Sequence, residues 1–272
     1  MVSGSLILVA TPIGNLRDLS PRAVEVLEAA TVICCEDTRR TGLLLQYAGV
    51  AKTKLIRCDD HTEYDLSTHI VDLVARGETV AVVTDAGTPG ISDPGQRLVA
   101  AVSEAGLAVS VVPGPAASIA ALVVSGLPTD RYAFEGFLPR KAGERAEHLQ
   151  SVASDRRTLV FYEAPHRLSA TLVVMAAVFG SDRRAALVRE LTKVHEEVLR
   201  GTLGDLLTHD PRGEYVIVVE GARPPVAATE DEIMEAMKDA MKRGMTHRDA
   251  AQFVSSTLDV NRRAAYDSVI RR

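Results

Sequence analysis

The sequence predicts an α/β protein of two successive domains followed by a small helical domain, and three observations carry this prediction. In the first half, short β-branched runs alternate with amphipathic helical patterns, which is typical of a mostly parallel sheet covered on both faces. In the second half, strand-like segments follow one another with fewer helices between them, which favours a mixed sheet. Three short helical patterns then close the chain. A chain of 272 residues with 46% hydrophobic content is long enough for this arrangement.

The first domain is expected to span residues 1–118. Ser20 is a good N-cap residue, and Pro21 directly after it suits the first position of a helix. The strands of this domain are predicted at 6–10, 31–35, 79–84 and 108–112, and its helices at 21–30, 39–48, 64–75 and 95–105.

The second domain is expected to span residues 119–223, after a boundary that we place within 113–130. The spacing is tightest between 185 and 202, where two strand-like segments follow each other almost directly, as in an antiparallel pair. The strands of this domain are predicted at 132–137, 158–163, 185–190, 194–202 and 214–220.

The third domain is expected to span residues 226–272, after a linker at Arg223-Pro224-Pro225 that stops the preceding fold. Thr246 and Asp259 stand where helix N-caps belong. Three short helices carrying basic residues suggest a bundle that resembles a helix-turn-helix. The helices are predicted at about 230–242, 246–256 and 259–270.

The charge distribution permits a phosphate-bearing partner in spite of a net charge of −5. Residues 1–128 hold 9 basic against 14 acidic side chains, whereas residues 129–272 hold 22 of each. Residues 238–272 carry eight basic side chains against four Asp. This basic end suits contact with a nucleic acid. A solvated helical surface explains the same charges equally well.

Composition also bears on the compartment. No uninterrupted apolar stretch reaches the about 20 residues of a membrane helix, and the N-terminus has no signal-peptide core. The three cysteines cannot all pair, and their spacing fits no metal-binding knuckle. Cys34 and Cys35 lie in an apolar run and are expected to be buried. We therefore expect a cytoplasmic protein without a membrane segment or a bound metal.

Four turns rich in Gly, Pro or charge directly follow predicted strands, at residues 11–16, 85–95, 113–115 and 163–167. Ligands of parallel sheets bind beyond the carboxyl ends of the strands. Glycine lets the backbone approach a ligand closely, and proline fixes the shape of the loop in advance. The turns therefore predict a binding cleft at this edge. Tight strand–helix turns without a ligand are the alternative.

The loops match none of the common phosphate or nucleophile motifs. There is no G-x-x-x-x-G-K-[ST] phosphate loop, no G-x-G-x-x-G fingerprint and no G-x-S-x-G elbow. A ligand held by backbone groups without a phosphate cradle fits an amino acid or a nucleoside better than a triphosphate.

Seven motifs in order along the chain resemble the bacterial 16S ribosomal RNA (cytidine-2′-O)-methyltransferases, a family of the tetrapyrrole-methylase superfamily. The resemblance covers essentially the whole chain. Two departures are Gly90, where a larger apolar residue is common, and Ala116, where Ser is frequent. The motifs are ATPIGNL (10–16), CEDTR (35–39), DAGTPGISDPG (85–95), SGLPTDRYAFEGFLPRK (125–141), FYEAPHRL (161–168), RELTKVHEE (189–197) and GEYVIVVEG (213–221).

The resemblance implies the two-domain tetrapyrrole-methylase fold of class III S-adenosylmethionine methyltransferases, with the cofactor in the cleft between the α/β domains. It further implies 2′-O-methylation of a cytidine ribose of 16S rRNA in the small ribosomal subunit, by a homodimer. A carboxylate such as Asp85 could instead cap a helix. The implied cofactor contacts are Pro12, Asp85, Gly87, Thr88, Pro89, Ile91, Ser92, Pro113, Gly114, Ala117, Tyr162 and Tyr215.

Methyl transfer to a ribose hydroxyl requires an aligned oxygen and the removal of its proton. Interpreting 189–197 as a strand places Arg189 and Lys193 on one face, from which both could point into the cleft. Glu163 and Glu190 could instead form structural pairs with Arg167 or Arg189. The candidates for a catalytic or RNA-orienting role from the matching motifs are Glu163, Arg189, Glu190 and Lys193.

Five further residues are candidates for contact with RNA. The family match favours substrate contact for Asp37 and Arg39, although a helix N-cap with solvated arginines explains this segment too. Arg140, Lys141 and Arg167 are candidate phosphate contacts, which position RNA without reading its sequence.

Two other functions compete with ribosomal RNA methylation. A methylase of the same fold could act on a small tetrapyrrole precursor. A non-catalytic RNA-binding assembly factor could hold S-adenosylmethionine as a structural ligand. The basic helical end and the motifs at 36–40 and 189–193 argue against the first of these.

Overall fold

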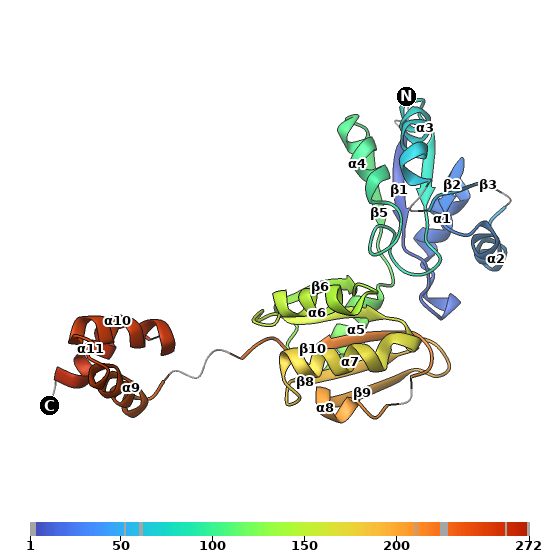
Figure 1. Cartoon of the computed structure of the whole chain (residues 1–272). Coiled ribbons are helices and arrows are strands. Elements are labelled where there is room, and N and C mark those ends of the chain that lie inside the picture. The colour runs from blue at the N-terminus through green and yellow to red at the C-terminus, as the bar shows by residue number, and fades with distance from the viewer. Residues whose placement is uncertain are drawn as a thin grey trace. The chain divides into compact units, whose positions relative to one another are not determined.

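The computed structural model describes residues 4–51, 53–59, 62–209, 211–223, 228–258 and 260–270. The chain divides into two compact units, Met1–Gly221 and Ala222–Arg272, and each is described by itself (Figure 1). Pro224, Pro225 and Asp259, which the sequence analysis singled out, lie outside the described residues.

The first sheet of the larger unit has five strands in the order β3-β2-β4-β1-β5, and every pairing is parallel. This confirms the parallel sheet predicted for the first half. Strand β3 was not predicted, because its two end residues are exposed, its two middle residues are only half-buried, and it gives no long apolar run. The strands are β1 (Ser5–Val9), β2 (Val32–Cys35), β3 (Lys54–Arg57), β4 (Thr79–Val82) and β5 (Ala108–Val112).

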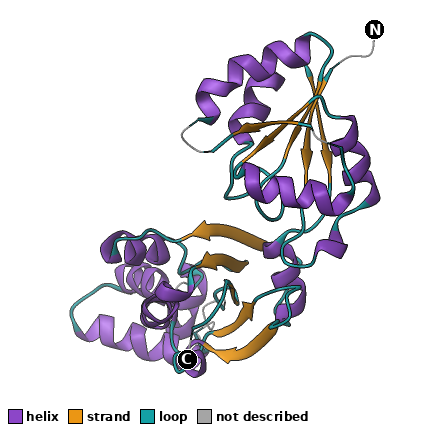
Figure 2. Ribbon diagram, turned by 90° about the vertical axis from the view of Figure 1, so that its right-hand side faces the viewer, coloured by secondary structure: helices purple, strands orange, loops and turns teal. Residues whose placement is uncertain are grey.

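Helices cover both faces of the first sheet, and Figure 2 shows its strands fanned between them. Alternate side chains of a strand point to opposite faces. Val32 and Cys34 therefore join a core cluster with residues of α3 and α4, whereas Ile33 and Cys35 join a second cluster with residues of α1 and α2. The helices are α1 (Pro21–Ala29), α2 (Thr38–Ala48), α3 (Glu63–Ala75) and α4 (Gln96–Glu104), and a short 3₁₀ turn, η1, spans Leu16–Asp18.

Helix α1 begins as the sequence predicts. The Ser20 side chain accepts a hydrogen bond from the Ala23 amide at 3.1 Å, and Pro21 occupies the first turn. The cap satisfies one of the amides that an α-helix leaves without an internal partner.

Cys34, Cys35 and Cys58 form no disulfide and are buried, which confirms the expectation for Cys34 and Cys35. Burial raises the pKa of the Cys34 thiol far above its ordinary value, and the neighbouring Cys58 and Cys35 raise it further. The Cys34 and Cys35 thiols therefore stay protonated and pack as small apolar side chains.

The second sheet has the order β6-β7-β10-β8-β9. Strands β6 and β7 pair in parallel, and the other pairings are antiparallel, which confirms a mixed sheet. The strand predicted from residue 194 begins only at Glu197. The strands are β6 (Tyr132–Phe137), β7 (Thr158–Glu163), β8 (Arg184–Arg189), β9 (Glu197–Thr202) and β10 (Tyr215–Val219).

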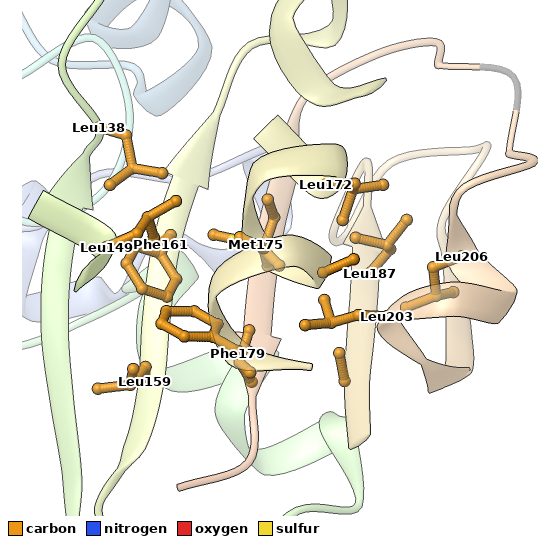
Figure 3. Packing of buried hydrophobic residues seen from close by; sticks show 14 of the residues in the cluster. Leu138, Leu149, Leu159, Phe161, Leu172, Met175, Phe179, Leu187, Leu203 and Leu206 are labelled. Carbon is orange, nitrogen blue, oxygen red and sulfur yellow. The ribbon is translucent and has the colours of Figure 1, made fainter. Parts of the chain in front are cut away.

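The second sheet packs helices on both faces as well. Tyr215, Ile217 and Val219 of β10 point into a core with α6, α7 and α8, whereas Val216 and Val218 point towards α5. Figure 3 shows Phe161, Met175 and Phe179 packed together in the larger of these cores. The sequence analysis did not place these helices, which are α5 (Ala117–Ser125), α6 (Ala142–Ser151), α7 (Pro165–Phe179) and α8 (Leu203–Leu206).

The smaller unit consists of α9 (Glu230–Lys242), α10 (His247–Leu258) and α11 (Arg262–Ile270), near the three predicted ranges. Its own core includes Ile233, Met237 and Val254. The Asp249 amide donates a hydrogen bond to Thr246 Oγ1 at 3.2 Å, which confirms Thr246 as the cap of α10. Before α11, the side chain of Asn261 accepts a hydrogen bond from the Arg263 amide at 2.8 Å.

Candidate active site

A cavity of about 590 Å³ lies within the larger unit, between loops that follow strands of the first sheet and residues of the second sheet. This volume suits a ligand of nucleoside size. Eleven of the residues singled out in the sequence line it together: Asp85, Gly87, Thr88, Ile91, Ser92, Ala117, Tyr162, Glu163, Glu190, Lys193 and Tyr215.

Hydrogen bonds fasten the loops after β1, β4 and β5 to one another. Thr11 and Gly87 exchange two backbone hydrogen bonds, at 2.8 and 3.1 Å. Thr88 Oγ1 donates to the Pro115 carbonyl at 3.0 Å. The Gly/Pro loops therefore form one continuous wall at the carboxyl edge of the sheet, which is where the sequence analysis expected a cleft.

Two glycines allow the close approaches in this wall. Gly87 has a φ of 86°, and an added Cβ would lie 3.4 Å from Ile13 Cγ2, beside the cavity. An added Cβ on Gly14 would lie only 2.8 Å from the Leu191 carbonyl oxygen. Gly14 therefore lets the loop after β1 touch the loop that follows β8.

Backbone strain concentrates around the cavity. Among the non-glycine residues that the structure describes, Ser92, Glu190 and Thr192 have positive φ, at 62°, 50° and 65°. Ser92 and Glu190 line the cavity, and Thr192 stands between two lining residues. Each such residue is destabilising by roughly 1–3 kcal/mol, and strain of this kind gathers at functional sites.

Asp85 is the acidic group of the β4 loop. Its Oδ2 lies 3.2 Å from Arg40 Nη1, whereas its buried Oδ1 has no hydrogen-bond partner. Asp85 does not cap α4, since Gly95 holds the N-cap position. One carboxylate oxygen at the cavity is thus left for a hydrogen-bond donor of a ligand.

Glu63 holds the end of the same loop. Its buried Oε1 accepts hydrogen bonds from the amides of Gly95, Arg97 and Leu98, at 2.8, 2.9 and 3.3 Å. Gly95 has no side chain for this purpose, so a carboxylate from the first turn of α3 caps α4 instead. The sequence analysis missed this residue, because its partners lie about 32 positions further along the chain.

The second sheet contributes two tyrosines. The Ser118 amide at the start of α5 donates to Tyr162 Oη at 3.2 Å, where the Ala116 N-cap offers no side-chain acceptor. Tyr215 Oη is hydrogen-bonded to His209 Nε2 at 2.8 Å and to the Arg212 amide at 3.0 Å. Both hydroxyls are therefore engaged by the protein, which leaves mainly the aromatic rings for contact with a ligand.

A cluster of three charged groups lines the wall beside the second sheet. Lys193 Nζ donates to Glu190 Oε1 at 3.0 Å and to Glu214 Oε2 at 2.6 Å. The Glu214 amide also donates to Glu190 Oε1, at 2.9 Å. Gly213, with a φ of 78°, leaves room for the Glu190 carboxylate.

Glu190 and Lys193 keep their charges in this cluster. Burial favours a higher pKa for Glu190, but the hydrogen bonds from the Glu214 amide and from Lys193 outweigh it and lower the pKa. Burial likewise favours a lower pKa for Lys193, but Glu214 and Glu190 raise it above its ordinary value. Lys193 is therefore a cation at neutral pH and cannot serve as a base there.

The expectation that 189–197 forms a strand is wrong. Residues 190–196 form the loop between β8 and β9, and positive φ at Glu190 and Thr192 breaks the alternation of faces. Lys193 lines the cavity from this loop, whereas Arg189 is not among the lining residues and lies 3.4 Å from Glu197 Oε2.

The Glu163 carboxylate forms hydrogen bonds within the protein. Its buried carboxylate accepts hydrogen bonds from the Ala164 amide at 2.9 Å and from Thr171 Oγ1 at 2.6 Å, and Arg167 Nε lies 3.4 Å away. Arg167 also donates to the carbonyls of Leu138 and Pro139. The structural pairing considered for Glu163 is thus present.

Four predicted cofactor contacts are absent from the lining of the main cavity: Pro12, Pro89, Pro113 and Gly114. Pro12 lines a smaller cavity of about 240 Å³, which shares Arg40 and Asp85 with the main one. An added Cβ on Gly114 would lie 3.0 Å from Ala10 Cβ, so this glycine accommodates β1.

The candidate RNA contacts lie away from the lining. Asp37 caps α2 through the Arg39 amide and pairs with the exposed Arg39 guanidinium at 2.9 Å, which lowers the pKa of Asp37. Lys141 pairs with Glu144 at 2.8 Å, and Arg140 stands beside it before α6.

The sequence analysis missed several lining residues. Glu36 and Arg40 lie next to the predicted Asp37 and Arg39, so the motif was found but not the side chains that reach the cavity. The others come from matched motifs, in which the sequence does not show which side chains face the cavity. They include Ile13, Phe137, Ala164, His166, Leu191 and Glu214.

The structure offers no cluster of three or more His, Cys, Asp or Glu that could hold a metal ion, within the part of the chain that it describes. Across the same residues, every helix is too short or too polar to pass through a bilayer.

Residues 5–207, about three quarters of the chain, match the sequence profile of the family described as Tetrapyrrole (Corrin/Porphyrin) Methylases. The chain belongs to the tetrapyrrole methylase family. Two solved structures share the fold of this chain. Uroporphyrin-III-C-methyltransferase from Thermus thermophilus superposes with a TM-score of 0.57 over 80% of this chain and 94% of that one, at 23% identity. The methyltransferase CobJ gives a TM-score of 0.61 over 81% and 95%, at 22% identity.

Within the tetrapyrrole methylases, curated relatives match nearly the full chain. The Synechocystis protein named ribosomal RNA small subunit methyltransferase I is 44% identical over 97% of this chain and 96% of its own length. Proteins of the same name from Pseudomonas aeruginosa and Mycobacterium tuberculosis are each 42% identical over 100% of this chain, and over 99% and 96% of their own lengths.

Proposed function

We propose that this protein is an S-adenosylmethionine-dependent methyltransferase that methylates the ribose 2′-hydroxyl of a cytidine in 16S rRNA of the small ribosomal subunit. The names of the full-length relatives support the RNA substrate. The observation that carries the chemistry is the cavity, where the loop of Asp85 and the charged cluster of Lys193 line one space of nucleoside size. This substrate places the activity in the bacterial cytoplasm.

The residues present fit the cofactor. The unpartnered oxygen of Asp85 can accept a hydrogen bond from an amino or hydroxyl group, and Ile91 and Tyr162 provide apolar cover for an adenine ring. Gly87 lets a ligand approach the backbone. S-adenosylmethionine would supply an activated methyl group on a sulfonium centre. The proposed cofactor contacts remain the twelve of the family resemblance, of which Pro12, Pro89, Pro113 and Gly114 shape the loops.

Cofactor binding is tested with Gly87→Val. A branched side chain at a φ of 86° is strained and projects beside Ile13, so we expect calorimetry to show an affinity for S-adenosylmethionine at least about tenfold lower. Gly106→Val is the matched control, because Gly106 has a φ of 69° and an added Cβ would meet nothing within 4 Å. Unchanged affinity of the Gly87 variant would show that the cofactor lies elsewhere.

Lys193 is the residue that we assign to the acceptor hydroxyl. Its ammonium group can lower the pKa of a ribose hydroxyl and stabilise negative charge that develops on the oxygen. Glu190 fixes its position, and the exposed Glu214 carboxylate can move aside when RNA arrives, since 81% of its side chain is accessible. We assign structural roles to the other two candidates. Glu163 stabilises the start of α7, and Arg189 stabilises the pairing of β8 with β9.

RNA contacts are proposed for the exposed cations that flank the site. Arg39, Arg140 and Lys141 are surface residues that can meet phosphates. Asp37 orients Arg39, and Arg167 holds the carbonyls of the Leu138–Pro139 segment that precedes Arg140.

The activity is tested on purified small ribosomal subunits that lack this methylation, with tritiated S-adenosylmethionine and mapping of the labelled nucleotide. We expect label on the 2′-oxygen of a 16S rRNA cytidine. Label on a tetrapyrrole precursor instead of RNA would contradict the proposal. Cofactor binding without label on either substrate would favour the non-catalytic assembly factor.

We further propose that the protein acts as a homodimer. Ile119 and Val123, one turn apart on α5, expose 43% and 68% of their surface, and Val111 on the edge strand β5 exposes 47%. Apolar side chains of this kind favour an interface. Sedimentation equilibrium should give twice the 29.2 kDa of one chain, and Val123→Glu should shift the mass towards that of one chain.

A further inference from the structure

The smaller unit has a concave basic surface that the catalytic proposal does not use. A cavity of about 540 Å³ is lined by Arg248, Asn261, Arg262, Arg263 and Tyr266. Arg248 lies in the first turn of α10, and the others lie at the start of α11 and one turn into it. Three guanidinium groups and an aromatic ring thus surround one hollow, which we call the arginine pocket.

The geometry of α11 explains why these side chains share a surface. Residues three and four apart on a helix stand on the same face. Tyr266 follows Arg262 by four positions and Arg263 by three. Ala265 of the same helix is fully buried in the core that also contains Ala250 and Val254 of α10, which fixes α11 against α10. The packing of α10 against α11 brings Arg248 to the same hollow.

The arginine pocket has no ion pair among the residues that the structure describes in the smaller unit. The structure gives Arg248, Arg262 and Arg263 no ion-pair partner among the residues that it describes, whereas Lys193, Arg167 and Arg157 of the larger unit all have one. Asp249, beside Arg248, is engaged by Thr246 Oγ1 at 2.6 Å. Like charges that line one hollow are unfavourable in the free protein, and an anionic ligand relieves their repulsion.

The chemistry of the pocket fits single-stranded RNA. Arginine guanidinium groups bind phosphates in a bidentate manner. Tyr266 exposes 41% of its surface, which offers a platform for an unstacked base. A double helix keeps its bases stacked, so the aromatic ring favours a single strand or a loop.

We infer that the arginine pocket binds the sugar–phosphate backbone of single-stranded RNA while a base stacks on Tyr266. This inference rests on the proposed RNA substrate and assigns part of its binding to the helical unit. The pocket provides affinity and placement, because phosphate contacts carry no sequence information.

The test compares two full-length triple variants. Arg248→Ala/Arg262→Ala/Arg263→Ala empties the arginine pocket, and Lys238→Ala/Lys242→Ala/Arg243→Ala removes the same charge from α9 and its end. The probe is a fluorescent single-stranded oligouridylate of about 12 nucleotides, a length within the range that such sites cover. Affinity is measured by fluorescence anisotropy at several salt concentrations.

The arginine-pocket variant should bind the oligonucleotide on the order of tenfold more weakly, and its salt dependence should lose a slope of about 2, or about 0.7 per phosphate contact. The α9 variant should retain most of the affinity. Tyr266→Leu should weaken binding with an unchanged salt slope, and Tyr266→Phe should restore it. Circular dichroism melts of all these variants, and of the three single Arg→Ala variants, verify that the helices stay folded.

Three outcomes would overturn the inference. The arginine-pocket variant could bind the oligonucleotide with wild-type affinity, or both triple variants could lose affinity equally. In the third, the arginine-pocket variant would lose binding to vesicles of anionic lipid but not to the oligonucleotide. Methylation of small subunits separates this inference from the proposed function. If RNA binding depends on the pocket but no RNA is methylated, the pocket stands and the proposed function fails. If small subunits are methylated with unchanged KM by the arginine-pocket variant, the proposed function stands and the pocket fails.

Discussion

Lys193 and Glu190 show how single residues at the cavity hold charges that the surroundings would otherwise suppress. Each is partly buried, and burial alone would favour its neutral form. Their mutual hydrogen bond and the contacts with Glu214 reverse this preference. The ammonium group is therefore preorganised at the wall of the cavity before any substrate binds, which is the condition under which electrostatic stabilisation is effective.

Lys193→Met should lower kcat for RNA methylation by roughly a hundredfold, the usual effect of removing one group that stabilises developing charge. The affinity for S-adenosylmethionine, measured by calorimetry, should change little. Lys193→Arg should recover part of the activity, since the charge is kept. Lys54→Ala, at an exposed position of β3, is the control. A loss below threefold in the Met variant would remove Lys193 from the reaction.

Glu190 should make stability depend on pH. Its pKa is lowered from the ordinary 4.5, so its stabilising contribution is present above about pH 4.5 and is lost as the pH falls through the lower folded value. The difference in unfolding free energy between the wild type and Glu190→Gln should therefore be largest at neutral pH and shrink in acid. Denaturant titrations at several pH values measure it, with Glu104→Gln on the surface of α4 as the control. A difference that grows in acid would contradict the lowered pKa.

At the scale of elements, the loop after β4 owes its shape to two loops and a helix that are distant in sequence. It is tied to the β1 loop through Thr11 and Gly87, to the β5 loop through Thr88, and to α3 through Glu63. The cavity wall is thus a product of the whole first sheet, and no single motif suffices to build it.

Glu63→Gln should destabilise the protein by about 1–3 kcal/mol, because three amides at the start of α4 lose a charged acceptor. It should also weaken S-adenosylmethionine binding, since the loop between β4 and α4 lines the cavity. Thermal melts and calorimetry measure the two effects. Asp65→Asn removes a charge from the same turn of α3 at an exposed position and should leave both unchanged. Equal effects of the two substitutions would rule out a specific role of the cap.

The sequence predicts elements well where the side-chain pattern is local. Buried apolar runs such as Thr79–Val82 predict strands, and Ser20-Pro21 predicts the start of a helix. Strand β3 is missed because an exposed edge needs no apolar run. The loop at 190–196 is mistaken for a strand because its backbone turns at Glu190 and Thr192, two non-glycine residues whose positive φ the sequence does not reveal.

The candidate site follows the same rule. Asp85 and Gly87 are recognisable because a strand end and a glycine-rich loop mark them. The roles of Glu63 and Glu214 depend on partners far away in the chain, and no spacing reveals them. Glu163 resembles a catalytic carboxylate in sequence, but Thr171 and the Ala164 amide occupy it in the fold.

At the scale of the whole molecule, the chain consists of a unit that contains the cavity and a helical unit that contains the arginine pocket. Each has its own hydrophobic core, so neither needs the other to bury its apolar side chains. The division separates the proposed chemistry from part of the proposed RNA binding.

A chain that ends at Gly221 should fold and bind S-adenosylmethionine with the affinity of the full-length protein. Its KM for small ribosomal subunits should rise about tenfold or more, whereas its kcat should change less, because the phosphate contacts of the helical unit are lost. Circular dichroism, calorimetry and methylation kinetics measure these quantities. A truncated protein that binds no cofactor although it is folded would show that the helical unit contributes to the cavity.

The buried cysteines of the first sheet have a use that follows from their inertness. Cys34 and Cys35 point to opposite faces of β2, and Cys58 packs with the first of them. A thiol reagent can react only when the sheet region opens, since the folded state buries all three cysteines and raises the pKa values of Cys34 and Cys35. The rate of thiol labelling in the native chain therefore measures local opening of the first sheet. Slower labelling in the presence of a ligand would show how strongly that ligand stabilises the closed sheet.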